Sequence, residues 1–206
     1  GAGAGIQADL NTILPCGGYG VCVITALTAQ NTLGVSGTMP VPGPFIQKQM
    51  EAVFSDLPPA AVKIGMLPNA EAVEAVSSVL QKQKESYRAR GKDLPIVLDP
   101  VMVSTSGTPL LEPEALSCLR EHLFPLCSLL TPNLPEAQAL LECSIKSSSQ
   151  MEDAAEEIAR RFGCSVLLKG GHSDTFSQEA ADCLHIGETG KTIWVSSPRL
   201  DCRNTH

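Results

Sequence analysis

Aromatic residues, positive charge and long apolar runs are all scarce in this chain. Only 4% of its 206 residues are aromatic, and 15 Lys plus Arg face 22 Asp plus Glu, for a net charge of −7. Nucleic-acid binding needs a basic face, so this balance argues against that class of partner. No apolar run is long enough to span a bilayer, and we expect neither a membrane partner nor a signal peptide. The 43% hydrophobic content suits a single globular domain with a buried core.

Metal-ligand spacing is also missing among the cysteines and histidines. None of the cysteines forms a Cys-x-x-Cys pair, and most lie in apolar segments, as Cys22 does. We interpret them as reduced core residues of an intracellular protein. They are Cys16, Cys22, Cys118, Cys127, Cys143, Cys164, Cys183 and Cys202.

Apolar runs alternate with helical patterns along the chain, which predicts an α/β fold with a mainly parallel sheet between helix layers. The predicted buried strands are residues 21–27, 60–66, 95–101, 128–130 and 165–168. The predicted helices are residues 6–14, 45–57, 70–90, 113–123, a segment from Pro135 to 141, and 151–162. We expect an exposed ribbon at 35–41, a linker at 147–150, and an antiparallel pair at 180–185 and 192–195.

Polar groups stand where three of these strands end. They are Asp99, then Asn133 with Glu136, then Lys169. Parallel strands end on one edge of a sheet, so we expect these groups to lie together. Carboxylates and an amide suit hydrated Mg²⁺, an ammonium suits phosphate, and together they favour a phosphate-handling enzyme. Singly, each has a structural interpretation: Asn133 or Thr131 as a helix cap, Glu136 as a dipole complement, and Lys169 as part of a glycine turn.

Two segments near the start are weaker signals. A glycine-rich turn containing Gly3 and Gly5 feeds a predicted helix and can present backbone N–H groups to an anion, but no strand precedes it. Gln30 and Asn31 follow the first apolar run, where they either read the edge of a heterocycle or form a plain polar turn.

Seven segments in order resemble the hydroxymethylpyrimidine/phosphomethylpyrimidine kinase of thiamine biosynthesis, a member of the ribokinase superfamily. They are residues 3–10, 23–35, 63–67, 98–102, 131–137, 168–172 and 203–206. The resemblance implies a ribokinase-like three-layer α/β/α sandwich over residues 1–206. The loop at 99–107 resembles the plant and algal version, in which the kinase is often fused to a thiamine-phosphate synthase.

The resemblance further implies that ATP phosphorylates 4-amino-5-hydroxymethyl-2-methylpyrimidine and then its monophosphate, with Mg²⁺ assisting. The implied pyrimidine contacts are Gln30, Met66, Val101, Gly3 and Gly5. The implied nucleotide and phosphate contacts are Lys169, Asn133 and Thr205, and the implied metal ligands are Glu136 and Asp99.

The chain departs from the family pattern at both ends. The family opens with an apolar strand before the glycines and continues after the segment Arg203 to His206 with Gly-Thr-Gly-Cys, the anion hole and catalytic base. We therefore expect the 206 residues to lack that strand and those catalytic groups, and to be inactive alone. A pyridoxal kinase-like enzyme and a non-catalytic pyrimidine- or nucleotide-binding remnant are the alternatives. We expect a homodimer, in the cytoplasm or a plastid.

Overall fold

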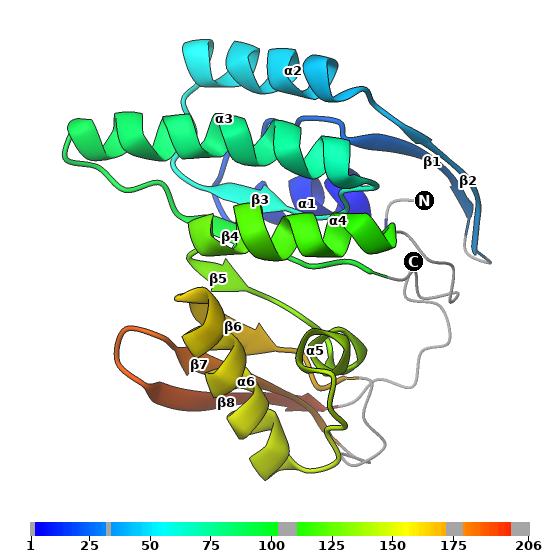
Figure 1. Ribbon diagram of the computed structural model, residues 1–206, viewed down its shortest axis with the longest axis vertical. Helices are drawn as coiled ribbons and strands as arrows, with labels where there is room; N and C mark the ends of the chain where they lie inside the picture. The colour runs from blue at the N-terminus through cyan, green and yellow to red at the C-terminus, as the bar shows by residue number, and fades with distance from the viewer. Residues whose placement is uncertain (1–2, 32–33, 103–110, 172–178, 199–206) are drawn as a thin grey trace.

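The computed structural model describes residues 3–31, 34–102, 111–171 and 179–198. These residues form a six-stranded sheet in the order β3-β4-β5-β6-β7-β8 (Figure 1). The first four strands pair in parallel, and β7 and β8 are antiparallel to their neighbours. The strands are β3 (Val62–Ile64), β4 (Ile96–Leu98), β5 (Leu129–Leu130), β6 (Ser165–Leu168), β7 (Glu179–Ile186) and β8 (Lys191–Pro198). The predicted mainly parallel sheet is therefore confirmed.

Helices cover the sheet on both faces. In Figure 1, α3, α4 and α6 lie in front of the sheet, and α1 lies behind β3. The helices are α1 (Gly5–Ile13), α2 (Gly43–Asp56), α3 (Ala70–Ala89), α4 (Pro113–Cys118), α5 (Leu134–Leu141) and α6 (Ser148–Phe162). The predicted helix at 113–123 continues beyond α4 as a π-helical turn, Leu119–Leu123. None of the described helices is long and apolar enough to cross a membrane.

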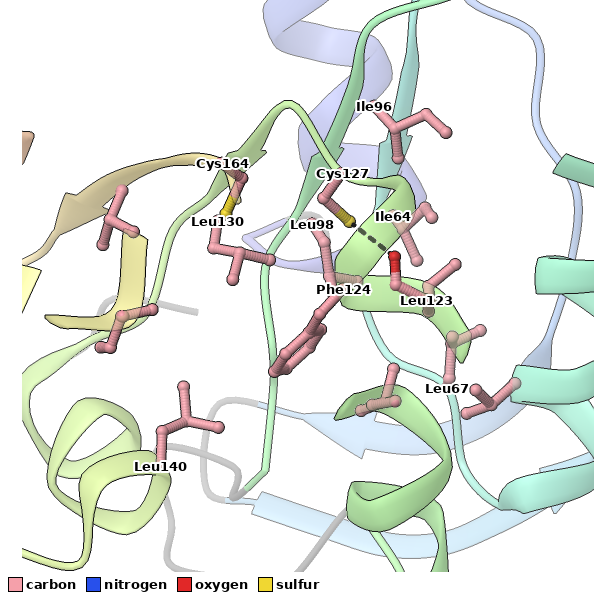
Figure 2. Packing of buried hydrophobic residues seen from close by; sticks show 14 of the residues in the cluster. Ile64, Leu67, Ile96, Leu98, Leu123, Phe124, Cys127, Leu130, Leu140 and Cys164 are labelled. Atoms are coloured by element: carbon pink, nitrogen blue, oxygen red, sulfur yellow. Dashed lines mark hydrogen bonds between the residues drawn. The ribbon is translucent and has the colours of Figure 1, made fainter. Parts of the chain in front are cut away.

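The main core lies between the sheet and the front helices. Figure 2 shows Phe124 extending into this cluster beside Leu98, both almost fully buried. The Phe124 ring meets Phe162 of α6 edge to face, with ring centroids 4.8 Å apart. This contact packs two segments far apart in the sequence against each other within the core.

Only part of the cysteine prediction is confirmed. Cys127, Cys164 and Cys183 are buried free thiols. Burial raises the pKa of Cys127 to about 12 and that of Cys164 to about 11, so both stay protonated and unreactive. For Cys16, Cys22 and Cys143 the expectation of core positions is wrong, since all three are exposed.

The predicted buried strand at 21–27 is wrong. Strand β1 (Ala26–Asn31) begins near the end of that run and pairs only with β2 (Gly34–Pro40), as a separate two-stranded ribbon. Residues 21–25 are irregular and partly exposed. A strand exists only by pairing, and among the described residues the sheet has no strand beside β3 on the side away from β4.

The predicted linker at 147–150 is also wrong. Ser147 is the N-cap of α6, and its side chain accepts a hydrogen bond from the Gln150 N–H. A polar cluster that looks like a linker is here a helix-start signal, because Ser satisfies a free N–H of the first turn. The predicted end of this helix at Gly163 is confirmed by its left-handed backbone.

The β6–β7 junction yields a stability prediction. A Cβ built on Gly170 would overlap the backbone carbonyl oxygen of Ala181 on β7, whereas none of the described atoms lies within 4 Å of a Cβ built on Gly171. We expect Gly170→Ala to lower the free energy of unfolding by about 3 kcal/mol, because the strand must shift. Gly171→Ala is the matched control and should change it little. Urea unfolding of both variants tests this, and equal stabilities would contradict it.

Candidate active site

The carboxyl ends of the parallel strands are joined by backbone hydrogen bonds that continue past the strands themselves. The Asp99 N–H donates to the Ile64 carbonyl, and the Lys169 N–H donates to the Pro132 carbonyl, both at 2.9 Å. Asn133 and Lys169 form an isolated parallel bridge. The residues that end β3, β4, β5 and β6 therefore lie in order along one rim, as the sequence predicts.

An ion pair closes this rim. The Lys169 Nζ lies 2.8 Å from the Asp99 Oδ1, although the two residues are 70 positions apart. Their side chains are 34% and 25% exposed respectively, so a ligand in solvent can reach both. Among the described residues, the Lys169 ammonium pairs with the carboxylate of Asp99, and phosphate oxygens can take that partner's place.

Asn133 and Glu136 form a capping box at the start of α5. The Asn133 Oδ1 accepts a hydrogen bond from the Glu136 N–H at 2.9 Å, and the Glu136 Oε2 accepts one from the Asn133 N–H at 2.8 Å. Asn133, rather than Thr131, is thus the cap, and Pro135 lies in the first turn as predicted. The structural interpretation of this pair is confirmed, and it coexists with a place on the rim.

Glu136 is nevertheless an unusual cap residue, because it is only 6% exposed. Burial raises the pKa of Glu136, and the nearby Asp99 charge raises it further. The backbone hydrogen bonds from Asn133 and Met102 and the charge of Lys169 act in the opposite direction without cancelling the shift. The Glu136 carboxyl therefore interacts electrostatically with both Asp99 and Lys169, and added positive charge would favour its ionised form.

Gln30 lies on the β1–β2 ribbon, at a point where the strand register shifts. Ala29 pairs with Gly37 and Gln30 with Val35, so Ser36 is the extra residue of a β-bulge. Gln30 is half-buried, whereas Ala29 and Asn31 on either side are exposed. Bulges re-aim side chains and are frequent beside active sites. Sequence reasoning missed this bulge, for which Ser36-Gly37 is the only local signal.

Met66 and Val101 follow β3 and β4, so both belong to the same end of the sheet as Asp99. Each is half-buried. The Val101 N–H donates to the Asp99 carbonyl at 2.8 Å, which fixes the turn after β4. The Met66 carbonyl accepts a hydrogen bond from the Thr25 hydroxyl at 2.8 Å, which attaches the base of the ribbon to the rim.

The remaining candidates lie elsewhere or outside the described residues. Gly3 and Gly5 are exposed at the start of α1, where Gly5 adopts a φ of 67° that favours glycine. An ion pair between Asp9 and Lys63, at 2.8 Å, holds α1 against β3. Thr205 and residues 103–107 of the loop at 99–107 lie outside the described residues.

The chemistry of the donor set can be compared with that of a metal site. Within residues 3–31, 34–102, 111–171 and 179–198, no three His, Cys, Asp or Glu side chains are grouped to hold a metal. Asp99 and Glu136 therefore do not form a protein-built metal cage. Two carboxylates beside an ammonium instead fit Mg²⁺, which keeps several waters and shares its ligands with phosphates.

Comparisons with known proteins agree on one family. The sequence pattern of the family described as phosphomethylpyrimidine kinase matches residues 1–206. The chain is 45% identical to the thiamine biosynthesis bifunctional protein ThiED of Geobacter sulfurreducens, covering all of this chain and 40% of that protein. It is 41% identical to the hydroxymethylpyrimidine/phosphomethylpyrimidine kinase of Haemophilus influenzae, covering 74% of that enzyme.

Solved structures give the same result. A crystal structure of phosphomethylpyrimidine kinase from Clostridium difficile aligns with 96% of this chain and 79% of its own, at 43% identity and a TM-score of 0.78. The ADP complex of Bacillus subtilis pyridoxal kinase aligns with 98% of this chain and 72% of its own, at 28% identity and a TM-score of 0.80. These alignments confirm the ribokinase-like fold. The expected family is likewise confirmed: the chain belongs to the phosphomethylpyrimidine kinase family of phosphotransferases.

Proposed function

We propose that the full product of this gene transfers phosphate from ATP to the hydroxymethyl group of 4-amino-5-hydroxymethyl-2-methylpyrimidine, and then to the resulting monophosphate. The names of the Haemophilus and Clostridium relatives support this substrate. The observation that carries the proposal is the grouping of Asp99, Asn133, Glu136 and Lys169 on one rim. That grouping supplies acid, amide and ammonium at the point where phosphates would lie.

In this proposal Lys169 exchanges one partner for another. Its ammonium holds the Asp99 carboxylate at 2.8 Å, and arriving nucleotide phosphates compete for the same donors. Asp99 and Glu136 would then hold Mg²⁺ directly or through water, with Asn133 keeping the first turn of α5 in place. The ion, when bound, neutralises phosphate charge. Its charge would also favour ionised Glu136, whose pKa burial raises.

The pyrimidine would lie between the ribbon and the end of β3. We assign the aminopyrimidine edge to the side-chain amide of Gln30, which carries a donor and an acceptor. Met66 and Val101 supply apolar contact with the ring, and Gly3 and Gly5 line the approach. The half-buried setting of Gln30 beside the β-bulge supports this assignment.

Pyridoxal is the alternative substrate, because pyridoxal kinases share this fold. Identity favours the pyrimidine, at 43% to the Clostridium kinase against 28% to the Bacillus pyridoxal kinase. Turnover of the two substrates by the same preparation separates them. Higher kcat/KM for pyridoxal would overturn the proposed substrate, and ligand binding without ADP release would indicate a non-catalytic protein.

We also propose a two-fold dimer. Leu27 and Met39 are cross-strand partners on the ribbon, and they are 51% and 60% exposed, which favours burial against another surface.

In the bifunctional Geobacter relative, the region that matches this chain is joined to further sequence. We propose cytoplasm or plastid as the compartment.

Removing the amide of Gln30 should weaken pyrimidine binding. We expect Gln30→Ala to reduce the binding free energy of the hydroxymethylpyrimidine by about 1–3 kcal/mol, because polar ligand groups lose their partner. Calorimetric titration measures this. The control is Thr28→Ala, at an exposed position of the same strand, which should bind as the native protein does. Unchanged affinity in Gln30→Ala would refute the assignment.

Neutralising Lys169 should weaken nucleotide binding selectively. We expect Lys169→Met to raise the Kd for MgATP about 10- to 100-fold, since a charged hydrogen bond to phosphate is lost. The Kd for the pyrimidine should stay unchanged, and Lys169→Arg should recover part of the loss. Equal weakening of both ligands would instead indicate that Lys169 only holds the rim together.

Replacing Glu136 by Gln should separate stability from turnover. Gln keeps an oxygen that can accept the Asn133 N–H, but it removes the charge, so we expect kcat to fall about 100-fold. Because burial raises the pKa of Glu136 in the folded state, the native group favours folding at low pH and loses that contribution as pH rises through its folded pKa.

The stability of Glu136→Gln relative to the native protein should therefore increase from about pH 5 to about pH 8. Urea unfolding at both pH values checks the sign. Glu157→Gln serves as the control, because hydrogen bonds from Arg161 and Arg160 lower the pKa of that half-buried helix residue. A Glu136→Gln variant with native turnover would contradict the proposed role.

A further inference from the structure

The base of the β1–β2 ribbon is held by a side-chain amide instead of a neighbouring strand. The Ile24 N–H donates to the Gln49 Oε1 at 3.0 Å, and the Gln49 Nε2 donates to the Ile24 carbonyl at 3.0 Å. Gln49 lies on α2, one turn after the fully buried Ile46 and next to the buried Met50. Both backbone groups of Ile24 are thus satisfied by a helix that is packed into the core.

The next residue attaches the ribbon to the end of β3. The Thr25 hydroxyl donates to the Met66 carbonyl at 2.8 Å, and the Val41 N–H donates to the Thr25 carbonyl at 3.0 Å. Thr25 precedes β1 and Val41 follows β2, so one residue ties both strands of the ribbon to the sheet. Beyond it, the Gly43 N–H at the start of α2 donates to the Glu71 Oε1 of α3 at 2.8 Å.

This attachment fixes the base of the β1–β2 ribbon, and Gln30 lies at some distance from that base. Gln30 is five residues beyond Thr25, which corresponds to about 16 Å at roughly 3.3 Å per residue of strand. A rotation of a few degrees at the base would therefore move the Gln30 amide by about 1 Å, and displacements of about that size are enough to spoil a bound geometry. Met66, at the fixed end, does not move with the ribbon.

We propose that Thr25 and Gln49 are positioning residues, which set the distance between Gln30 and Met66 and so the affinity for the pyrimidine ring. The inference rests on the proposed function, because it takes Gln30 and Met66 as the two sides of the pyrimidine site. The residues act through the ribbon and not by touching the substrate. Among the described residues, the hydrogen bonds of Thr25 and Gln49 reach Ile24, Val41 and Met66, and none reaches the nucleotide end of the rim, which β4, β5 and β6 build.

The test compares Thr25→Val, which keeps the shape and removes the hydroxyl, with Thr25→Ser, which keeps the hydroxyl. Calorimetry on the full gene product measures the Kd for the hydroxymethylpyrimidine and, separately, for MgATP. We expect Thr25→Val to raise the pyrimidine Kd about 3- to 10-fold, from one lost hydrogen bond and a freer ribbon. The MgATP Kd should stay within about twofold, and Thr25→Ser should restore native pyrimidine affinity.

The other possible results contradict either the positioning role or the proposed function. Native pyrimidine affinity in Thr25→Val, or equal loss of both ligands without rescue by Thr25→Ser, would overturn the positioning role. Absence of pyrimidine binding by the native protein would instead overturn the proposed function. Should Thr25→Val fail to fold, Gln49→Leu is measured by the same criteria, with faster amide exchange across β1 and β2 as a second expected result.

Discussion

The parallel backbone pairing of β3, β4, β5 and β6 is the constraint on which the site depends. Its hydrogen bonds extend beyond the strands, from Asp99 to Ile64 and from Lys169 to Pro132. Because the strands run in one direction, side chains far apart in the chain reach the same edge. The Asp99–Lys169 ion pair, closed across 70 residues, is the direct result. Burial is the main reason that the pKa of the neighbouring Glu136 is raised, and the charges of Asp99 and Lys169 act on it in opposite directions.

The start of α5 combines a helix cap with part of the proposed phosphate site. Asn133 and Glu136 complete a capping box, which is by itself sufficient reason for both residues at the start of a helix. Their location on the rim suits the second role that we propose for them, because the capping interactions fix the position of both side chains. The cost of burying Glu136 is offset in part by N–H groups of Asn133 and Met102 and by Lys169. The interactions that begin the helix would thus preorganise the proposed site.

The sequence predicted correctly those features of the fold that follow from the spacing of apolar residues. The alternation of apolar and helical segments gave the parallel sheet, and the polar residues after three strands gave the rim. It failed where the structure of a segment depends on which other segments of the chain it bonds to. The apolar run at 21–27 looks like a buried strand, yet the Ile24 backbone bonds to the Gln49 side chain and the Thr25 hydroxyl donates to the Met66 carbonyl. The polar residues from Ser147 onward suggest a linker, but Ser147 is the N-cap of α6. The bulge at Gln30 and the exposure of Cys22 depend on the tertiary structure around the ribbon, which composition does not predict.

The ribbon and the rim, which we propose as the two parts of the site, are joined where the Thr25 hydroxyl donates to the Met66 carbonyl. The most direct measurement of the central claim is a crystal structure of the full gene product with the hydroxymethylpyrimidine and a non-hydrolysable MgATP analogue. The account predicts phosphate oxygens within hydrogen-bonding distance of the Lys169 Nζ, and the pyrimidine amine against Gln30. Phosphates bound at the opposite edge of the sheet, with the Asp99–Lys169 pair intact, would contradict it.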